Sequence, residues 1–405
     1  MMAIRALVTA RLPRAMAPRF AALSHLQQSA ITFSTTSGSD DDDAFVAPVV
    51  EENGVISSIP ITQATADDRL KFFALLKETQ DRILPEGIGK HMENTFELMG
   101  HRHVILRDNT LKIISLMKDW ETTKTTETKG FVIDGERGSG KSFALQQIVQ
   151  FARESNWLVL YVPNARAWCV EAPYVMRSPV DESKFDIDVF GVELLEKFLH
   201  CHGAQLSEIP LRGSYGDRYY PASFKAKPKS TAEYDAATLT LRDLVENGIK
   251  DEDLACTAVV DLRAELAKVT EFPVLIAVDE YNLWFQKTVF GFEGKEVFPS
   301  DIRVVDALKD IGADGLEPSR TLANGLFIAA VTENYPSHYE FKKQVNYRPL
   351  RTTMRTYTQE ELESVVAYYN QVSFLHDKPT QSELAYFRLM TKALPLHVTD
   401  RASFS

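Results

Sequence analysis

Gly135-Glu-Arg-Gly-Ser-Gly140-Lys141-Ser142 is the stretch that decides the fold, because it matches G-x-x-x-x-G-K-[ST] at every fixed position. Residues 130–134 before it predict a short buried strand, and residues 143–151 after it predict an amphipathic helix. A strand, a Gly-rich turn and a helix N-terminus in this order direct backbone N–H groups at an anion. The sequence therefore predicts a nucleotide-binding loop, in which Lys141 reaches the β- and γ-phosphates and Ser142 binds Mg²⁺. The residues predicted to bind the phosphates are Gly135, Glu136, Arg137, Gly138, Ser139, Gly140, Lys141 and Ser142.

A second apolar strand, predicted over 272–278, ends in the acid pair Asp279-Glu280. We expect Asp279 to hold Mg²⁺ through water, and Glu280 is the candidate catalytic base that activates water. A third strand over 325–331 is followed by Thr332 and Asn334, which either sense the γ-phosphate or are ordinary turn residues. No Asn-Lys-x-Asp motif occurs, so the sequence leaves open whether the base is guanine or adenine, as GTP/GDP or ATP.

Strands and helices alternate through the middle of the chain, and the strands are apolar runs such as 157–162. This pattern predicts an α/β fold with a parallel sheet covered by helices on both faces. Helices are also predicted over 66–77, 109–120, 192–199, 239–245, 362–369 and 381–394, with a capping box at Thr358-Gln-Glu-Glu361. The C-terminal helices predict a small lid, and Arg348, Arg351 and Arg355 before them are candidates to reach phosphates, RNA or a neighbouring protein.

Composition divides the 405 residues further. Residues 1–39 contain four arginines and no acid, which is typical of an organelle transit peptide, although a disordered basic tail has the same composition. The acidic run 40–43 marks a linker. The chain carries a net charge of −11, or −15 without the leader, so any contact with nucleic acid must be local. We predict a transit peptide over 1–39, an N-terminal extension and linker over 40–100, a P-loop domain over 101–345 and a C-terminal helical lid over 346–405.

An insertion near 211–235 interrupts the helical pattern. Residues 211–230 hold five basic residues against one acid and interleave four aromatic residues, Tyr215, Tyr219, Tyr220 and Phe224. Such a segment suits single-stranded or looped RNA, and a solvated surface insertion explains it equally well. The three cysteines form no C-x-x-C, which indicates a reducing compartment, and His200-Cys201-His202 is interpreted as a helix end rather than a metal site. No apolar run is long enough to predict a membrane span.

Four segments in order resemble the P-loop protein family of the mitochondrial small ribosomal subunit called death-associated protein three. They are residues 135–142, residues 157–165 with Trp168, residues 273–282 with Asp279 and Asn282, and residues 357–370 with paired tyrosines. The resemblance does not extend to residues before about 100 or to 211–235. It implies an AAA/STAND-like fold and a structural nucleotide held by Gly135, Gly140, Lys141 and Ser142, with Asp279 on the metal.

The resemblance also implies a location in the mitochondrial matrix and partners among ribosomal proteins, with small-subunit rRNA reached through local basic segments. The family does not depend on a catalytic acid at the position of Glu280, so hydrolysis stays open and a weak NTPase is the lesser alternative to a structural role. The competing functions are an AAA-like mitochondrial ATPase in assembly or remodelling, which needs an arginine finger in trans, and a small-molecule or nucleotide kinase. Neither a second arginine motif after Thr332 nor a compact Arg-rich lid is evident.

Overall fold

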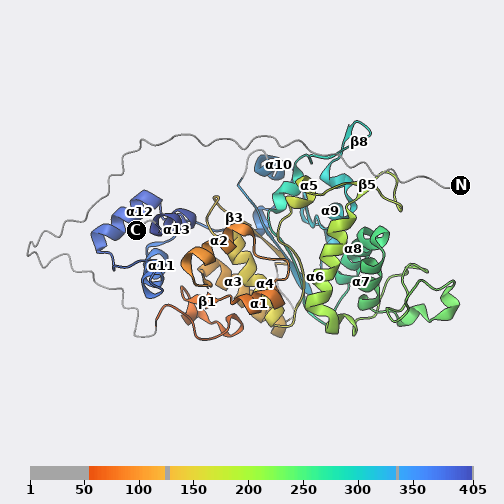
Figure 1. Ribbon diagram of the computed structural model, residues 1–405, viewed down its shortest axis with the longest axis horizontal. Coiled ribbons are helices and arrows are strands. Elements are labelled where there is room, and N and C mark those ends of the chain that lie inside the picture. The colour runs from red at the N-terminus through yellow and green to blue at the C-terminus, as the bar shows by residue number, and fades with distance from the viewer. Residues whose placement is uncertain (1–53, 124–127, 334–336, 404–405) are drawn as a thin grey trace, which may run out of the picture. The chain divides into compact units, whose positions relative to one another are not determined.

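A five-stranded parallel sheet forms the centre of the computed structural model, which describes residues 54–123, 128–333 and 337–403. The strand order is β13-β3-β12-β7-β4. Figure 1 shows the sheet, with β3 labelled, between layers of helices. The strand over 130–134, which precedes the P-loop (residues 135–142), therefore lies inside the sheet. Its two neighbours are the strands over 325–330 and 351–353, both from much later in the chain. The strands are β3 (Gly130–Asp134), β4 (Leu158–Val162), β7 (Val274–Val278), β12 (Gly325–Ala330) and β13 (Arg351–Thr353).

Helices cover both faces of this sheet, which confirms the predicted α/β P-loop fold. One face packs against α1 (Lys77–Ile83), α2 (Lys90–Met99), α3 (Asp108–Thr123) and α4 (Lys141–Glu154). The other face packs against α6 (Asp188–Leu206), α7 (Leu241–Lys250) and α8 (Glu252–Leu266). The remaining helices are α5 (Ala167–Val170), α9 (Arg303–Ala307), α10 (Ser337–Gln344), α11 (Gln359–Gln371), α12 (Gln381–Thr391) and α13 (Pro395–Ala402).

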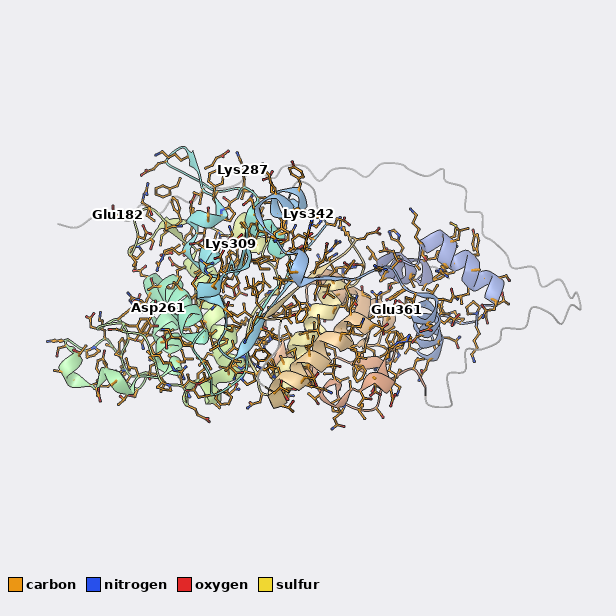
Figure 2. The ribbon with its side chains drawn as sticks, turned by 180° about the vertical axis from the view of Figure 1, so that it is seen from behind. Glu182, Asp261, Lys287, Lys309, Lys342 and Glu361 are labelled. Atoms are coloured by element: carbon orange, nitrogen blue, oxygen red, sulfur yellow. The ribbon has the colours of Figure 1, made fainter. Side chains whose placement is uncertain are left out.

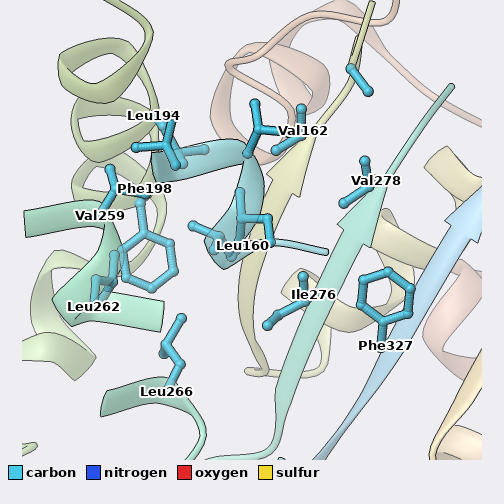
Figure 3. Close-up of a cluster of buried hydrophobic side chains, with 14 of the residues drawn as sticks. Leu160, Val162, Leu194, Phe198, Val259, Leu262, Leu266, Ile276, Val278 and Phe327 are labelled. Atoms are coloured by element: carbon cyan, nitrogen blue, oxygen red, sulfur yellow. The ribbon is translucent and has the colours of Figure 1, made fainter. Parts of the chain in front are cut away.

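Side-chain alternation along each strand divides the core in two. Leu160 and Val162 of β4 point to the α6–α8 layer, where Figure 3 shows them facing Leu194 and Phe198, while Tyr161 between them points to the α3–α4 layer. The strands of the interior are buried on both sides, which explains why their sequences are continuous apolar runs. Short antiparallel strand pairs lie outside the sheet: β1 (Phe72–Ala74) with β2 (His103–Ile105), β5 (Met176–Arg177) with β6 (Phe185–Asp186), β8 (Gly291–Phe292) with β9 (Lys295–Glu296), and β10 (Ile311–Gly312) with β11 (Gly315–Leu316).

The predicted helix over 66–77 is wrong. This segment forms a short 3-10 turn capped by Asp68, then β1, and only at Lys77 an α-helix. Phe72 and Phe73 alternate between two apolar clusters, and the Phe72 ring stacks on Tyr368 with centroids 3.8 Å apart. The apolar spacing that resembled a helix is a strand period over three residues, fixed by pairing with β2.

The other predicted helices are present, with α12 ending earlier than expected. Lys392 and Ala393 adopt left-handed backbone conformations (φ 53° and 52°), which end α12 at Thr391 before Pro395 begins α13. Within the described ranges, no helix is both long and apolar enough to cross a membrane. The predicted transit peptide and the acidic linker run lie outside the described residues.

Candidate functional site

The P-loop connects β3 to the first turn of α4 through glycines with positive φ. Gly135 has φ 145°, and a Cβ there would lie 2.2 Å from the carbonyl oxygen of Met354. Gly138 has φ 84°, and a Cβ there would lie 2.7 Å from Cβ of Leu396. Only glycine fits these two positions, so the loop is held close to both β13 and α13 while it leads into the N-terminus of a 14-residue helix.

Lys141 is buried at the start of α4 and folds back over the loop. Its Nζ donates hydrogen bonds to the carbonyl oxygens of Gly135 at 2.8 Å and Glu136 at 2.7 Å. Burial lowers the pKa of this ammonium group, while the carboxylates of Asp279 and Asp134 oppose that shift. The site therefore places a cation where the β- and γ-phosphates of a nucleotide would need one.

Asp279 follows β7, and its side chain lies beside Lys141 and Ser142 of the P-loop. Its buried carboxylate accepts a hydrogen bond from the backbone N–H of Glu280 at 2.8 Å, and the Ser142 hydroxyl lies near enough to lower its pKa. Burial raises the pKa of Asp279, and the Ser142 hydroxyl, the hydrogen bond from Glu280 and the charge of Lys141 work against the rise. A hydroxyl beside a carboxylate offers the hard oxygen ligands that Mg²⁺ takes, so the predicted pair Ser142 and Asp279 fits this ion.

Glu280 lies next to this pair in a left-handed conformation with φ 56°. Burial and, after it, the charge of Asp279 raise the pKa of Glu280 to about 7. A carboxyl group with this pKa can exchange a proton near neutral pH, which is the property required of a general base.

Thr332 follows β12 and is fixed through its backbone by Asn282. The Asn282 side chain accepts a hydrogen bond from Thr332 N at 2.7 Å and donates one to Thr332 O at 2.9 Å. Asn282 is fully buried. In the sequence it stands out only as part of the segment 273–282, and nothing there predicts that it contacts Thr332. Asn334, predicted beside Thr332, lies outside the described residues.

Arg107 connects the P-loop to the C-terminal helices, and no sequence pattern predicted it. Its guanidinium donates to the carbonyl oxygen of Ser139 at 2.9 Å and to both carboxylate oxygens of Glu361 at 2.8 and 3.0 Å. Tyr357 packs over the guanidinium, 5.0 Å from ring centroid to Cζ. Glu361, labelled in Figure 2, belongs to the capping box of α11 that the sequence predicts. Its ion-pair partner Arg107 lies 254 residues away in the sequence, so the pattern gives no sign of this contact.

A cavity of about 470 Å³ extends from the P-loop between the N-terminal and C-terminal segments. Its polar end contains Arg137, Gly138, Ser139, Gly140, Lys141, Ser142, Asp279, Glu280 and Thr332, while Gly135 and Glu136 shape the loop behind them. The rest of its lining combines apolar and aromatic side chains, including Ile88, Met92, Phe143 and Tyr368, with polar ones such as His91 and Thr95. The volume and this mixed lining match those of a site for a small ligand with an anionic part and a flat ring.

Ser139 supplies a second test of the fit to phosphate. Its Oγ is buried, and among the described residues it has no hydrogen-bond partner. A phosphate oxygen at the polar end of the cavity would satisfy this hydroxyl, since buried polar atoms are normally paired. The P-loop residues therefore fit the group that their pattern predicted.

Two of the three arginines before α11 make contacts beside the P-loop, Arg351 through its side chain and Arg355 through its backbone. Arg351 in β13 forms an ion pair with Asp134, with Nε 2.9 Å from Oδ2, and so fastens the edge of the sheet. Arg355 contributes its carbonyl oxygen to Arg107 at 2.9 Å. Both contacts stabilise the region around the P-loop.

The basic insertion binds the body of the protein through most of its aromatic residues. Tyr219 is fully buried and donates to Asp261 of α8 at 2.6 Å, and Tyr215 donates to Glu265 at 2.8 Å (Figure 2 labels Asp261). Tyr220 is buried as well, so the rings of Tyr219 and Tyr220 are not free to stack on RNA bases, whereas the Tyr215 ring is half-buried. Lys225, Lys227 and Lys229 are exposed and form the accessible basic part of the segment.

Comparison with known proteins assigns the chain to a family. Residues 104–391 match the family described as mitochondrial ribosomal death-associated protein 3. The small ribosomal subunit protein mS29 of Mus musculus is 24% identical over 315 residues, covering 74% of this chain and 76% of the mouse protein. The protein of the same name from Bos taurus is 23% identical over 231 residues, covering 56% and 55%.

Solved structures give weaker likenesses. The Aeropyrum pernix ORC2 protein in its ADP form aligns with a TM-score of 0.35 and 10% identity, covering 73% of this chain and 60% of that one. A TM-score of this size carries no information about function. The family match, in contrast, extends from β2 through the P-loop to α12, and so this chain belongs to the family of mitochondrial ribosomal death-associated protein 3.

Proposed function

We propose that this protein is a component of the small subunit of the mitochondrial ribosome, in the matrix, and that it holds a nucleotide with Mg²⁺ in its P-loop. Family membership and the mS29 relatives support the ribosomal part of this proposal. The nucleotide part rests on one observation: Lys141, Ser142 and Asp279 meet at the polar end of a 470 Å³ cavity.

Each group at this end has a separate task in binding. The loop N–H groups, Lys141 and the Ser139 hydroxyl would bind the phosphates, and Ser142 and Asp279 would hold Mg²⁺. The ion would screen phosphate charge when bound. The apolar and aromatic part of the lining would receive the base by stacking and apolar contact, without a feature that selects guanine over adenine.

The walls of the cavity favour a structural role for the nucleotide. They come from three parts of the chain: the N-terminal segment with α2 and β2, the P-loop core, and the C-terminal helices α11 and α13. A ligand in contact with all three parts stabilises their association by its binding free energy, about 2.7 kcal/mol at a hundredfold excess over Kd.

Glu280 supports a second candidate, a working NTPase in assembly or remodelling. Its pKa of about 7 and its place beside Asp279 are those of a residue that activates water. The two functions make opposite demands on this side chain. A structural nucleotide needs only binding, whereas turnover needs the carboxylate.

Sedimentation of mitochondrial lysates distinguishes the candidates. We expect the wild-type protein and Glu280→Gln to migrate with the small ribosomal subunit, and Lys141→Ala to be depleted from that fraction, because Lys141 contributes to binding the phosphates and Glu280 does not. Normal incorporation of Lys141→Ala would contradict a required nucleotide. A block caused by Glu280→Gln, with triphosphate trapped on the protein, would establish the NTPase instead.

A further inference from the structure

A second cluster of chemically reactive side chains lies on the opposite face of the sheet from α3 and α4, where α6 begins beside α8. It consists of Asp186 at the end of β6, Asp188 in the first turn of α6, and Cys256 in α8. One carboxylate oxygen from each aspartate and the cysteine sulfur all lie within 4.8 Å of one another. All three residues are buried, and none belongs to the nucleotide cavity.

Local structure brings these residues together. Asp186 ends β6 and Asp188 begins α6, while Ile187 between them is the N-cap of α6 and is buried in the core. The backbone N–H of Ile187 donates to the Cys256 sulfur at 3.3 Å. Gly191 lets the two helices approach, since a Cβ there would lie 3.2 Å from the backbone nitrogen of Cys256.

The hydrogen bonds of the fold leave part of this cluster unsatisfied. Asp186 and Asp188 are only 1% and 4% exposed, yet Oδ1 of each lacks a hydrogen-bond partner in the part of the chain that the structure describes. The other oxygen of Asp186 accepts a hydrogen bond from Arg303 Nη1 at 2.9 Å. A buried carboxylate oxygen without a donor is costly, and a bound cation would remove that cost.

The charge balance points to a dication. Arg303 is the cation that the structure pairs with the cluster, and Glu252 and Asp253 at the start of α8 add negative potential around Asp188. Two aspartates and a cysteine thiolate carry three negative charges. One dication together with the Arg303 guanidinium would neutralise them, with Arg303 already held by Asp186 and the Thr257 hydroxyl.

We propose that Asp186, Asp188 and Cys256 form a Zn²⁺ site that joins the start of α6 to α8. Zn²⁺ accepts both thiolate and carboxylate ligands, at about 2.3 and 2.0–2.2 Å, whereas Mg²⁺ and Ca²⁺ take oxygen ligands. Tetrahedral ligands at these distances lie roughly 3.4–3.6 Å apart. The three ligand atoms, all within 4.8 Å of one another, therefore need only small side-chain shifts to close on one ion. The thiol of Cys256 gives its proton to solvent when the sulfur binds the metal, and water takes the fourth position.

The test measures zinc bound to the full-length protein after incubation with Zn²⁺ and dialysis against excess Mg²⁺. Elemental analysis should find about one zinc per chain in the wild type and less than a tenth of that in Cys256→Ser. Cys169→Ser is the matched control, because Cys169 is also buried in the described core but lies outside the cluster. It should keep the full zinc content. Equal zinc in wild type and Cys256→Ser, or none in the wild type, would overturn the proposal.

Two further readouts protect the test against a variant that folds poorly. With Co²⁺ in place of Zn²⁺, the wild type should show a thiolate-to-cobalt charge-transfer band, which a Co²⁺ ion at Ser142 and Asp279 cannot produce. Asp188→Asn should lower the thermal midpoint in the presence of Zn²⁺, because it removes a ligand. An increase in that midpoint would mean that the wild type holds only an uncompensated buried carboxylate, and would contradict the site.

Discussion

Glu280 combines a strained backbone with a perturbed carboxyl group in the lining of the cavity beside the P-loop. Its left-handed conformation (φ 56°) costs a non-glycine residue on the order of 1 kcal/mol, which glycine would avoid. Glycine would also remove the carboxylate whose pKa burial and Asp279 raise to about 7. The residue thus holds an acid next to the proposed magnesium ligand at the expense of local stability.

The pH dependence of the free energy of unfolding measures how much the ionised Glu280 carboxylate destabilises the folded state. Since the pKa of Glu280 in the folded state lies above its ordinary value of 4.5, its contribution favours the folded state below pH 4.5 and is lost as pH rises through about 7. Glutamine cannot ionise, so Glu280→Gln should raise the free energy of unfolding at pH 8 by ~1–3 kcal/mol and change it little at pH 4.5. Urea titrations at both pH values check this. An equal effect at the two pH values would contradict the raised pKa.

At the scale of elements, one side chain at the N-terminus of α11, that of Glu361, makes two separate contacts. Glu361 completes the capping box, accepting from Thr358 N at 2.8 Å, and forms the buried ion pair with Arg107. Both partners of that pair are less than a tenth exposed, so removal of either one leaves a buried charge.

We expect Arg107→Leu or Glu361→Leu to lower the free energy of unfolding by about 3–5 kcal/mol. The double variant should lose clearly less than the sum of the two, because no charge remains buried. The exposed pair Lys287–Glu296 provides the control, and Glu296→Gln there should cost under ~1 kcal/mol. Chemical denaturation of the four variants measures the coupling. Additive losses would indicate that the pair does not act as a unit.

Continuous apolar runs made β4, β7 and β12 predictable from sequence, because a parallel strand buried on both faces needs no polar alternation. The segment 66–77 was not predictable in this way. Phe72 and Phe73 serve two different clusters, and three residues are too few to separate a strand period from a helical one.

The candidate nucleotide site likewise has a part that the sequence predicts and a part that it does not. The P-loop is one contiguous segment whose glycines and lysine have fixed spacing, so its position and its partner Asp279 followed from the pattern. Arg107 and Asn282 act through contacts with residues that are far away in sequence, Glu361 and Thr332. Such contacts exist only after the sheet has assembled, and a single sequence carries no signal of them.

At the scale of the whole described molecule, a bound nucleotide would connect three parts of the chain around one cavity. Thermal unfolding should reflect this connection. Mg²⁺ with GDP or ADP at a hundredfold excess over Kd should stabilise the wild type by about 2.7 kcal/mol. The same additions should leave Lys141→Ala unchanged, because its P-loop lacks the ammonium group. A thermal midpoint of wild type that does not respond to either nucleotide would contradict the proposed role of the cavity.

The nucleotide content of the protein isolated with the small ribosomal subunit tests the central claim most directly. The subunit is purified by sedimentation, the protein is denatured, and the released small molecules are identified by mass spectrometry and compared with subunits containing Lys141→Ala. We predict about one guanine or adenine nucleotide with Mg²⁺ for each copy of this chain, lost in the variant. Subunits that contain the wild-type chain but release no more nucleotide than those with Lys141→Ala would contradict the account.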